Sequence, residues 1–155
     1  YFLTDTQKYS KFFLRNISGS RFHDWNSDYQ RYKSIADWAM DRLEGCTHIG
    51  LERYSFGSKG KVFHIAENTG ILKYKFFQNN IPVEVITPSE VKKRACGKGN
   101  ANKADMHSAF QKDTGYNLAK LMTPDKKEVT NPVSDIVDAY YVCKCLYDNI
   151  KYTMI

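Results

Sequence analysis

Two aspartates, Asp135 and Asp138, lie three residues apart inside the otherwise apolar run NPVSDIVDAYYVCKCLYD at residues 131–148. Charged side chains are rarely buried unless another group pairs with them or they coordinate an ion. Residues three apart lie on the same side of an α-helix, so both carboxylates would point the same way. They also lie in the first turns after Pro132, near the helix end that tolerates carboxylates. The pair indicates either a ligand site or two solvent-facing acids at a helix start.

Glu52 is a third carboxylate at a position typical of ligand sites, the end of a strand. It ends an apolar strand predicted within residues 47–54 and precedes a loop with Gly57 and Gly60. Ligands in open α/β sheets gather at the carboxyl ends of strands. Together with Asp135 and Asp138 it would supply the oxygen ligands that Mg²⁺ prefers. Two such ions about 3.5–4 Å apart can activate water and stabilise the leaving oxygen of a phosphodiester. Taken alone, Glu52 is equally consistent with a surface salt bridge.

A basic tract without acidic residues covers VKKRACGKGNANKA at residues 91–104. Its glycines let the main chain approach a ligand closely, and its cations suit a phosphate backbone. The glycine pattern fits no nucleotide-binding fingerprint, and a solvated basic loop is the alternative interpretation. The predicted DNA-binding cations are Lys92, Lys93, Arg94, Lys98 and Lys103.

Three aromatic residues, Tyr54, Phe56 and Phe63, lie in or beside the loop after Glu52. Rings in such a loop can stack on bases or wedge between them, or they can pack onto the following helix. The net charge of +6 and the pI of about 9.1 favour an anionic partner, with nucleic acid first and a membrane surface second. No Ser–His or Cys–His pattern indicates a nucleophilic enzyme.

The elements that must position these residues read as an α/β fold in one domain over residues 1–155. Short aromatic runs at 1–4 and 11–17 predict strands, as do residues 47–54 and 81–87. Between and after them, helices are expected at 26–45, 62–78, 88–96, 102–115 and 117–122, and a last helix contains the two aspartates. This order predicts a mixed sheet flanked by helices.

Two details of the helices are specific enough to be checked. For the helix at 26–45, Ser27 is the expected N-cap and Gly45 the expected stop, with Trp38 on the apolar face. For the helix at 62–78, Ile65 and Phe76 are placed on the apolar face.

No apolar run approaches the ~18 residues of a membrane span, and no signal peptide is recognisable, so a cytoplasmic site is expected.

Three blocks of the sequence resemble a known family: IGLERYSFG…VFHIAENTGILKYKF, PVEVITPSEVKKRACGKGNANKADM and SDIVDAYYV. In this order and spacing they are similar to RuvC-type Holliday-junction resolvases, within the RNase H-like superfamily. The resemblance covers about residues 29–148, and the middle block, from Val91 to Lys103, is its most specific part. The divergent surroundings suggest a phage or viral version, which would act in the cytoplasm of a host cell.

The resemblance implies a homodimer that cuts four-way DNA junctions with paired symmetric nicks, using Mg²⁺ or Mn²⁺. It implies that Glu52, Asp135 and Asp138 bind the metal and carry catalysis. It further implies that Lys92 and Lys103 meet the DNA backbone and the scissile phosphate, with Lys103 taking part in catalysis. Tyr54 or Phe56 would be the ring that probes the junction.

One departure from the family pattern concerns its first catalytic aspartate, which normally ends the first strand in a G-x-D-x-S-like context. No such context is found, and Asp5 in FLTDTQ only follows an apolar run. The preferred interpretation places the first strand upstream of Tyr1, which makes residues 1–4 and 11–17 the second and third strands. The alternatives are a catalytically inactive junction-binding module, or another RNase H-like nuclease such as an RNase or a terminase-type enzyme.

Overall fold

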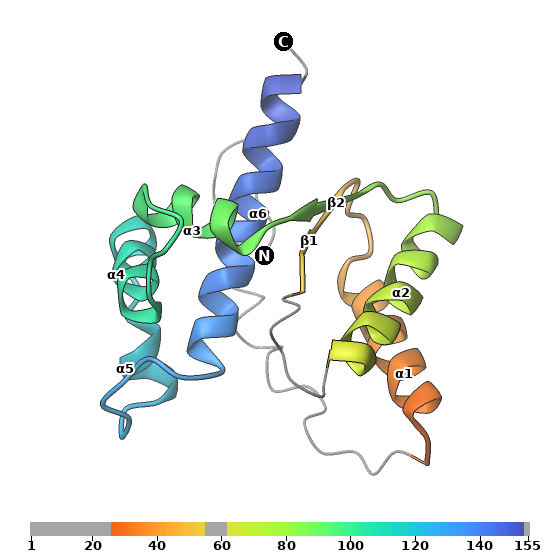
Figure 1. Cartoon of the computed structure of the whole chain (residues 1–155), viewed down its shortest axis with the longest axis horizontal. Helices are drawn as coiled ribbons and strands as arrows, with labels where there is room; N and C mark the ends of the chain where they lie inside the picture. The colour runs from red at the N-terminus through yellow and green to blue at the C-terminus, as the bar shows by residue number, and fades with distance from the viewer. Residues whose placement is uncertain (1–25, 55–61, 154–155) are drawn as a thin grey trace. The chain divides into compact units, whose positions relative to one another are not determined.

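The computed structural model describes residues 26–54 and 62–153 of the chain (Figure 1). Within them, β1 and β2 form a two-stranded parallel sheet, and α2 is the crossover between the strands. The strands expected at residues 1–4 and 11–17 lie outside this part, so two strands of the predicted mixed sheet are described. The elements are α1 (Asp28–Arg42), β1 (Ile49–Glu52), α2 (Val62–Gln78), β2 (Val83–Ile86), α3 (Pro88–Cys96), α4 (Lys103–Thr114), α5 (Leu118–Met122) and α6 (Val133–Thr153).

The chain divides into two compact units. The described part of the first unit comprises residues 50–52 and 85–153, and that of the second comprises residues 26–49, 53–54 and 62–84. No helix among the described residues is both long enough and apolar enough to cross a membrane.

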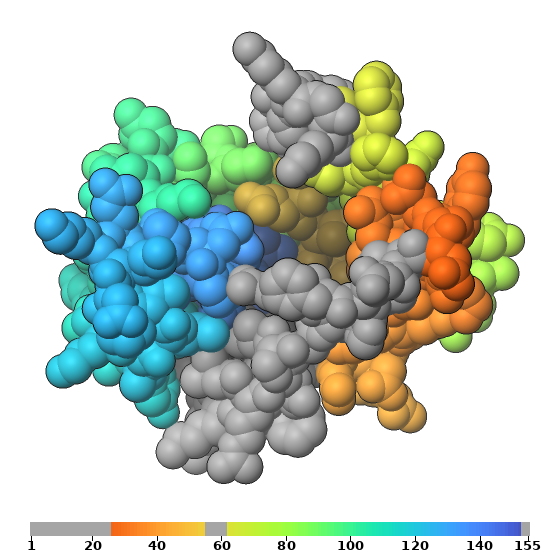
Figure 2. Space-filling model, turned by 90° about the horizontal axis from the view of Figure 1, so that it is seen from below, coloured from red at the N-terminus to blue at the C-terminus, as the bar shows by residue number. Residues whose placement is uncertain are grey.

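The first unit is built around α6, against which α3, α4 and α5 pack (Figure 1). The ring of Tyr140 lies edge-on to Phe110 of α4, with centroids 4.9 Å apart. Its neighbour Tyr141 donates a hydrogen bond to Asp113 over 3.1 Å, and Lys144 forms an ion pair with the same carboxylate at 2.8 Å. Figure 2 shows the cyan region around α5 bordering the blue region of α6. This side of α6 therefore combines buried rings with a polar anchor to α4.

Side-chain caps set the limits of α3 and α4. Thr87 and Glu90 form a reciprocal capping box at the start of α3, and Asn102 and Asp105 form one at the start of α4. Both helices end at a glycine with a left-handed backbone, Gly97 with φ 74° in the case of α3. These local signals explain why both helices occur within one residue of the predicted limits.

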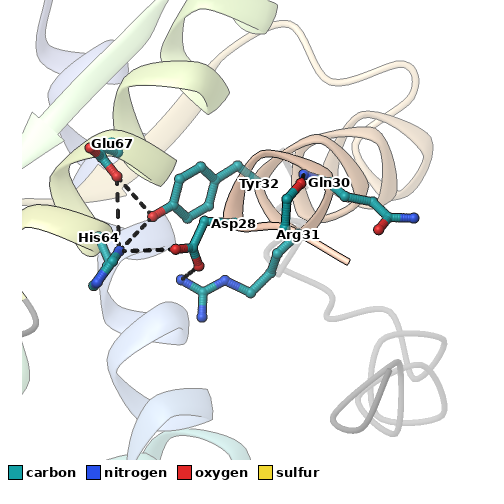
Figure 3. Close-up of polar contacts among 7 residues, drawn as sticks. Asp28, Gln30, Arg31, Tyr32, His64 and Glu67 are labelled. Carbon is teal, nitrogen blue, oxygen red and sulfur yellow. Dashed lines mark hydrogen bonds and ion pairs between the residues drawn. The ribbon is translucent and has the colours of Figure 1, made fainter. Parts of the chain in front are cut away.

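The second unit consists mainly of α1 and α2, which lie side by side. Tyr32 of α1 is fully buried, and its hydroxyl donates a hydrogen bond to Glu67 and also contacts Nδ1 of His64, both at 2.9 Å (Figure 3). Asp28 lies 3.8 Å from the same His64 nitrogen. A polar cluster between α1 and α2 thus replaces part of an apolar interface.

The second unit also corrects three predictions. Ser27 caps α1 as expected, but the helix ends at Arg42, before Gly45. Trp38 is 39 % exposed, because the buried stripe of α1 runs through Tyr32, Ala36 and Ala39 instead. On α2, Phe76 is buried as predicted whereas Ile65 is 40 % exposed. Periodicity identified both helices, but the polar partners of Tyr32 decided which face of α1 is buried.

Candidate active site

Glu52 is positioned by the close approach of β1 to α6. A Cβ atom on Gly50 would lie 3.0 Å from Cγ1 of Val142 and 3.3 Å from Cβ of Leu146, so the missing side chain allows this contact. Residues two apart in a strand share a face, and residues four apart in a helix share a face. The contact between Gly50 and Val142 therefore brings Glu52 alongside Asp138.

The electrostatics of Glu52 agree with this placement. Its pKa is raised, first by desolvation and then by the negative charge of Asp138, with a further contribution from Asp135. Lys92 acts in the opposite direction. The side chain remains accessible at the surface, so a ligand from solvent can reach this carboxylate.

Asp138 of α6 is half-buried and directly follows the buried Val137. Desolvation raises its pKa, and the charge of Asp135 raises it further, while Lys92 and Lys103 lower it. Asp135 itself is exposed. The two aspartates thus share a side of the helix as predicted, with only Asp138 removed in part from solvent.

Lys92 and Lys103 lie on two different helices, and the positive charge of each lowers the pKa of a site carboxyl group. Lys92 belongs to α3 and acts on both Glu52 and Asp138, whereas Lys103 is the first residue of α4 and acts on Asp138. Neither ammonium group forms an ion pair with a residue of the described ranges. The first unit therefore brings together five of the predicted site residues: Glu52, Lys92, Lys103, Asp135 and Asp138.

The other cations of the basic tract have different environments. Arg94 forms an ion pair with Asp148 of α6 at 2.5 Å, and Lys98 forms one with Asp105 at 2.9 Å. Lys93 is exposed, and no ion pair of its side chain occurs among the described residues. Two of the predicted DNA contacts thus already have acidic partners in the fold.

The two predicted junction-probing rings, Tyr54 and Phe56, follow Glu52 in the chain. Tyr54 is half-buried and belongs to the second unit, and Phe56 lies outside the described residues. Phe63, in the first turn of α2, is 75 % exposed and does not pack into the core. The role of Tyr54 and Phe56 stays a prediction.

The three carboxylates fit a divalent metal in donor chemistry but not in spacing. Mg²⁺ takes oxygen ligands, and the raised pKa values of Glu52 and Asp138 mark negative charge that a cation would offset. Within residues 26–54 and 62–153, however, no group of three or more His, Cys, Asp or Glu side chains is arranged to hold a metal ion. Asp5 lies outside the described residues. The described carboxylates therefore match a divalent metal in donor chemistry but do not by themselves form a metal site.

Two residues that the sequence analysis missed, Asp105 and Asp148, hold the basic tract in place. The capping-box spacing between Asn102 and Asp105 was a local signal that could have identified the first. Asp148 pairs with Arg94, which lies 54 positions away, and no local sequence pattern predicts such a contact.

Comparison with known proteins connects this arrangement to one group of nucleases. No family model matches the chain. The crossover junction endodeoxyribonuclease RuvC of Corynebacterium diphtheriae is 34 % identical over 68 residues, which are 43 % of this chain and 42 % of that protein. The aligned part is thus less than half the length of this curated relative.

Two solved structures share the fold. The Thermus thermophilus RuvC structure matches with a TM-score of 0.62 and 14 % identity, over 85 % of this chain and 76 % of that one. RuvC of the same organism in complex with a Holliday junction substrate matches with a TM-score of 0.59 and 14 % identity, over 78 % and 70 %. The resemblance to RuvC-type Holliday-junction resolvases, predicted from three sequence blocks, is confirmed in sequence over part of this chain and in fold over most of it.

Proposed function

We propose that this protein is a structure-selective, metal-dependent endonuclease that resolves four-way DNA junctions by paired symmetric nicks. The observation that carries the proposal is the convergence of Glu52, Asp135 and Asp138 with Lys92 and Lys103 in a RuvC-like fold. Raised pKa values of carboxylates that also face specific charged partners are typical of functional sites.

The roles of the residues follow from their charges and positions. Glu52, Asp135 and Asp138 would hold Mg²⁺, and Mn²⁺ would substitute because it binds the same oxygen ligands. When bound, the metal supplies an electrophile for the phosphate and lowers the pKa of an attacking water. Lys92 and Lys103 would hold the scissile phosphate and offset negative charge that develops during cleavage.

Branched DNA is the proposed substrate and a homodimer the proposed assembly. A solved RuvC with a similar fold carries a Holliday junction, which supports the same class of substrate here. The excess of positive charge in the chain and the basic tract on α3 and the following loop would favour contact with phosphates. Two symmetric nicks in one junction require two equivalent active sites, which a dimer with two-fold symmetry provides.

The test is cleavage of an end-labelled four-way junction with Mg²⁺ and with EDTA. We expect paired nicks that require the metal. Glu52→Gln should reduce the rate at least about 100-fold, as loss of one preorganised group at a charged transition state does. Junction binding by this variant, measured in EDTA, should stay within about twofold of wild type because the basic tract is unchanged.

The matched control is Glu128→Gln, which removes an exposed carboxylate from the loop before α6. This variant should cleave at the wild-type rate. Retained cleavage by Glu52→Gln would refute the assignment of the site. If the wild type bound the junction tightly but made no nicks with any metal, the endonuclease proposal would be refuted and the junction-binding module supported.

A further inference from the structure

His107 of α4 is a buried histidine that has no role in the proposed nuclease site. Its side chain is 7 % exposed, and Met106 and Phe110 of the same helix are buried as well. The Nε2 atom of His107 accepts a hydrogen bond of 3.2 Å from the main-chain N–H of Ala119 in α5. Only the neutral imidazole ring has a nitrogen that can accept, and its proton is then on Nδ1. The contact between α4 and α5 therefore requires an uncharged His107.

The hydrogen bond satisfies an amide that α5 itself leaves without a partner. The first N–H groups of a helix have no acceptor within that helix. At the start of α5, the side chain of Asn117 accepts from the N–H of Lys120, and His107 accepts from that of Ala119. Loss of the acceptor from a partly buried donor costs more than the bond contributes on balance. His107 is thus a cap for α5 that comes from a neighbouring helix.

The attachment of α5 depends on few contacts. The helix has five residues, of which only Leu118 is buried. Leu121, in contrast, is 65 % exposed. A helix of this length is not stable alone in water, so its contacts with the rest of the unit maintain it. Besides the bond to His107, these are the packing of Leu118 and the contact of α5 with α6.

Protonation of His107 would remove its acceptor, because an imidazolium ring carries an N–H on both nitrogens. The ring would then direct a donor at the donor of Ala119. Burial lowers the pKa of His107 from its ordinary 6.5, which is the direction expected of a ring that the fold keeps neutral. No charged side chain of the described residues contributes to this shift, although each neighbouring helix carries some: Lys92 on α3, Lys103 on α4, Lys120 on α5, and Asp135 and Asp138 on α6.

We propose that the contact between His107 and Ala119 is a pH-sensitive latch, which holds α5 on α4 while the ring is neutral and releases α5 when the ring is protonated. The ring of the released state takes up its proton near pH 6.5, and the latched ring does so only at lower pH. The latch therefore weakens as pH falls below 6.5. Because α5 leads through residues 123–132 into α6, its release loosens the segment that precedes Asp135.

The first experiment measures the exchange of the Ala119 amide with water by NMR, in the full chain at pH 7.5 and pH 5.5. Rates are divided by those of an unstructured peptide, so that the intrinsic pH dependence of exchange cancels. In the wild type we expect the protection of this amide to fall about 5–10-fold, since linkage changes the equilibrium by at most about tenfold per pH unit. Equal protection at both pH values would overturn the proposal.

His107→Gln is the variant that isolates the titration, because its side-chain oxygen can accept from Ala119 at any pH. We expect its Ala119 amide to be protected equally at pH 7.5 and pH 5.5. The matched control is His48→Gln, which changes a histidine of the second unit and should keep the wild-type pH dependence. A folded His107→Gln whose Ala119 protection falls as in the wild type would refute the latch.

The ring nitrogens of the wild type provide a test that needs no variant at position 107. Their ¹⁵N chemical shifts should show a proton on Nδ1 and none on Nε2 at pH 7.5, and the midpoint of the titration should lie below 6.5. A proton on Nε2 at pH 7.5, or a midpoint at or above 6.5, would overturn the proposal. None of these measurements uses DNA or a metal, so their outcome is separate from that of the junction-cleavage test.

Discussion

Two carboxylate sites, one in each unit of the molecule, have opposite electrostatic environments. In the second unit, Asp37 of α1 accepts hydrogen bonds from Lys33 and from Lys75 of α2, both at 2.5 Å, and these two bonds lower its pKa. In the first unit, Glu52 and Asp138 each have a raised pKa. The negative charge of Asp138 contributes to the shift of Glu52, and that of Asp135 contributes to the shift of Asp138. The site at Asp37 has its negative charge neutralised within the fold, whereas the site at Glu52 and Asp138 keeps an excess of negative charge.

The difference separates carboxylates that stabilise the fold from carboxylates that are available to a ligand. Asp37 connects two helices, and its charge is already compensated by two ammonium groups. Desolvation and like charges near Glu52 and Asp138 cost stability, and functional sites commonly carry such costs. The basic tract divides in the same way, because Arg94 and Lys98 have acidic partners while Lys93 has none among the described residues.

The largest expected effect in this comparison is on junction binding, and it separates the unpaired from the paired cations of the basic tract. Lys93→Ala should weaken junction binding by about 3–10-fold and lower the salt dependence of log K by about 1, because an exposed ammonium group is available to a phosphate. Arg94→Ala should weaken binding less, since its guanidinium group must first leave Asp148. Fluorescence anisotropy with a labelled junction in EDTA, at several salt concentrations, measures both.

Arg94→Ala and Lys93→Ala also act as controls for one another in stability. Loss of the pair between Arg94 and Asp148 should destabilise the fold by less than about 1 kcal/mol, as expected of a partly exposed pair. Lys93→Ala should leave the melting temperature unchanged. If Arg94→Ala proved the more harmful to binding, paired and unpaired cations in the tract would not differ in function.

The sequence predicted those features that depend on local signals. The limits of α3 follow from a capping box at Thr87 and from the left-handed glycine at its end, and β1 ends at Glu52 as expected. The three blocks of resemblance led to the RuvC-like fold that the solved structures share. The spacing of Asp135 and Asp138 correctly placed both on one side of a helix.

Other features depend on contacts between distant residues, and the sequence did not reveal them. The partners of Tyr32 lie 32 and 35 positions away, and they draw this side chain rather than Trp38 into the interior. The pairing of Arg94 with Asp148 is equally distant. Amphipathic periodicity ranks residues by hydropathy, so a buried tyrosine whose hydroxyl is satisfied by polar groups escapes it.

Removing one carboxylate from each unit should shift stability in opposite directions. Glu52→Gln relieves repulsion with Asp138 and should raise the melting temperature at pH 7 by about 1 °C, a small effect because the side chain is accessible to solvent. Asp37→Asn removes two ion pairs and should lower it by no more than about 2 °C. Differential scanning calorimetry of both variants checks the signs, and shifts of the same sign would remove the contrast between the units.

The smallest expected effect is the pH dependence of these two shifts in melting temperature, which tests whether both arise from charge. The pKa of Asp37 is lowered from its ordinary 3.8, so the unfolded chain binds the proton more readily. The contribution of Asp37 to stability therefore begins to decrease as pH falls below 3.8 and is lost as pH falls through the lowered pKa of the folded chain. The pKa of Glu52 is raised from its ordinary 4.5, so the folded chain binds the proton more readily, and its unfavourable contribution develops as pH rises past that value. Melting temperatures of wild type, Asp37→Asn and Glu52→Gln between pH 3 and pH 7 should therefore approach one another toward the acid end and separate to opposite sides of the wild type toward neutrality. A Glu52→Gln shift that persists unchanged at pH 3 would show that its origin is packing and not charge.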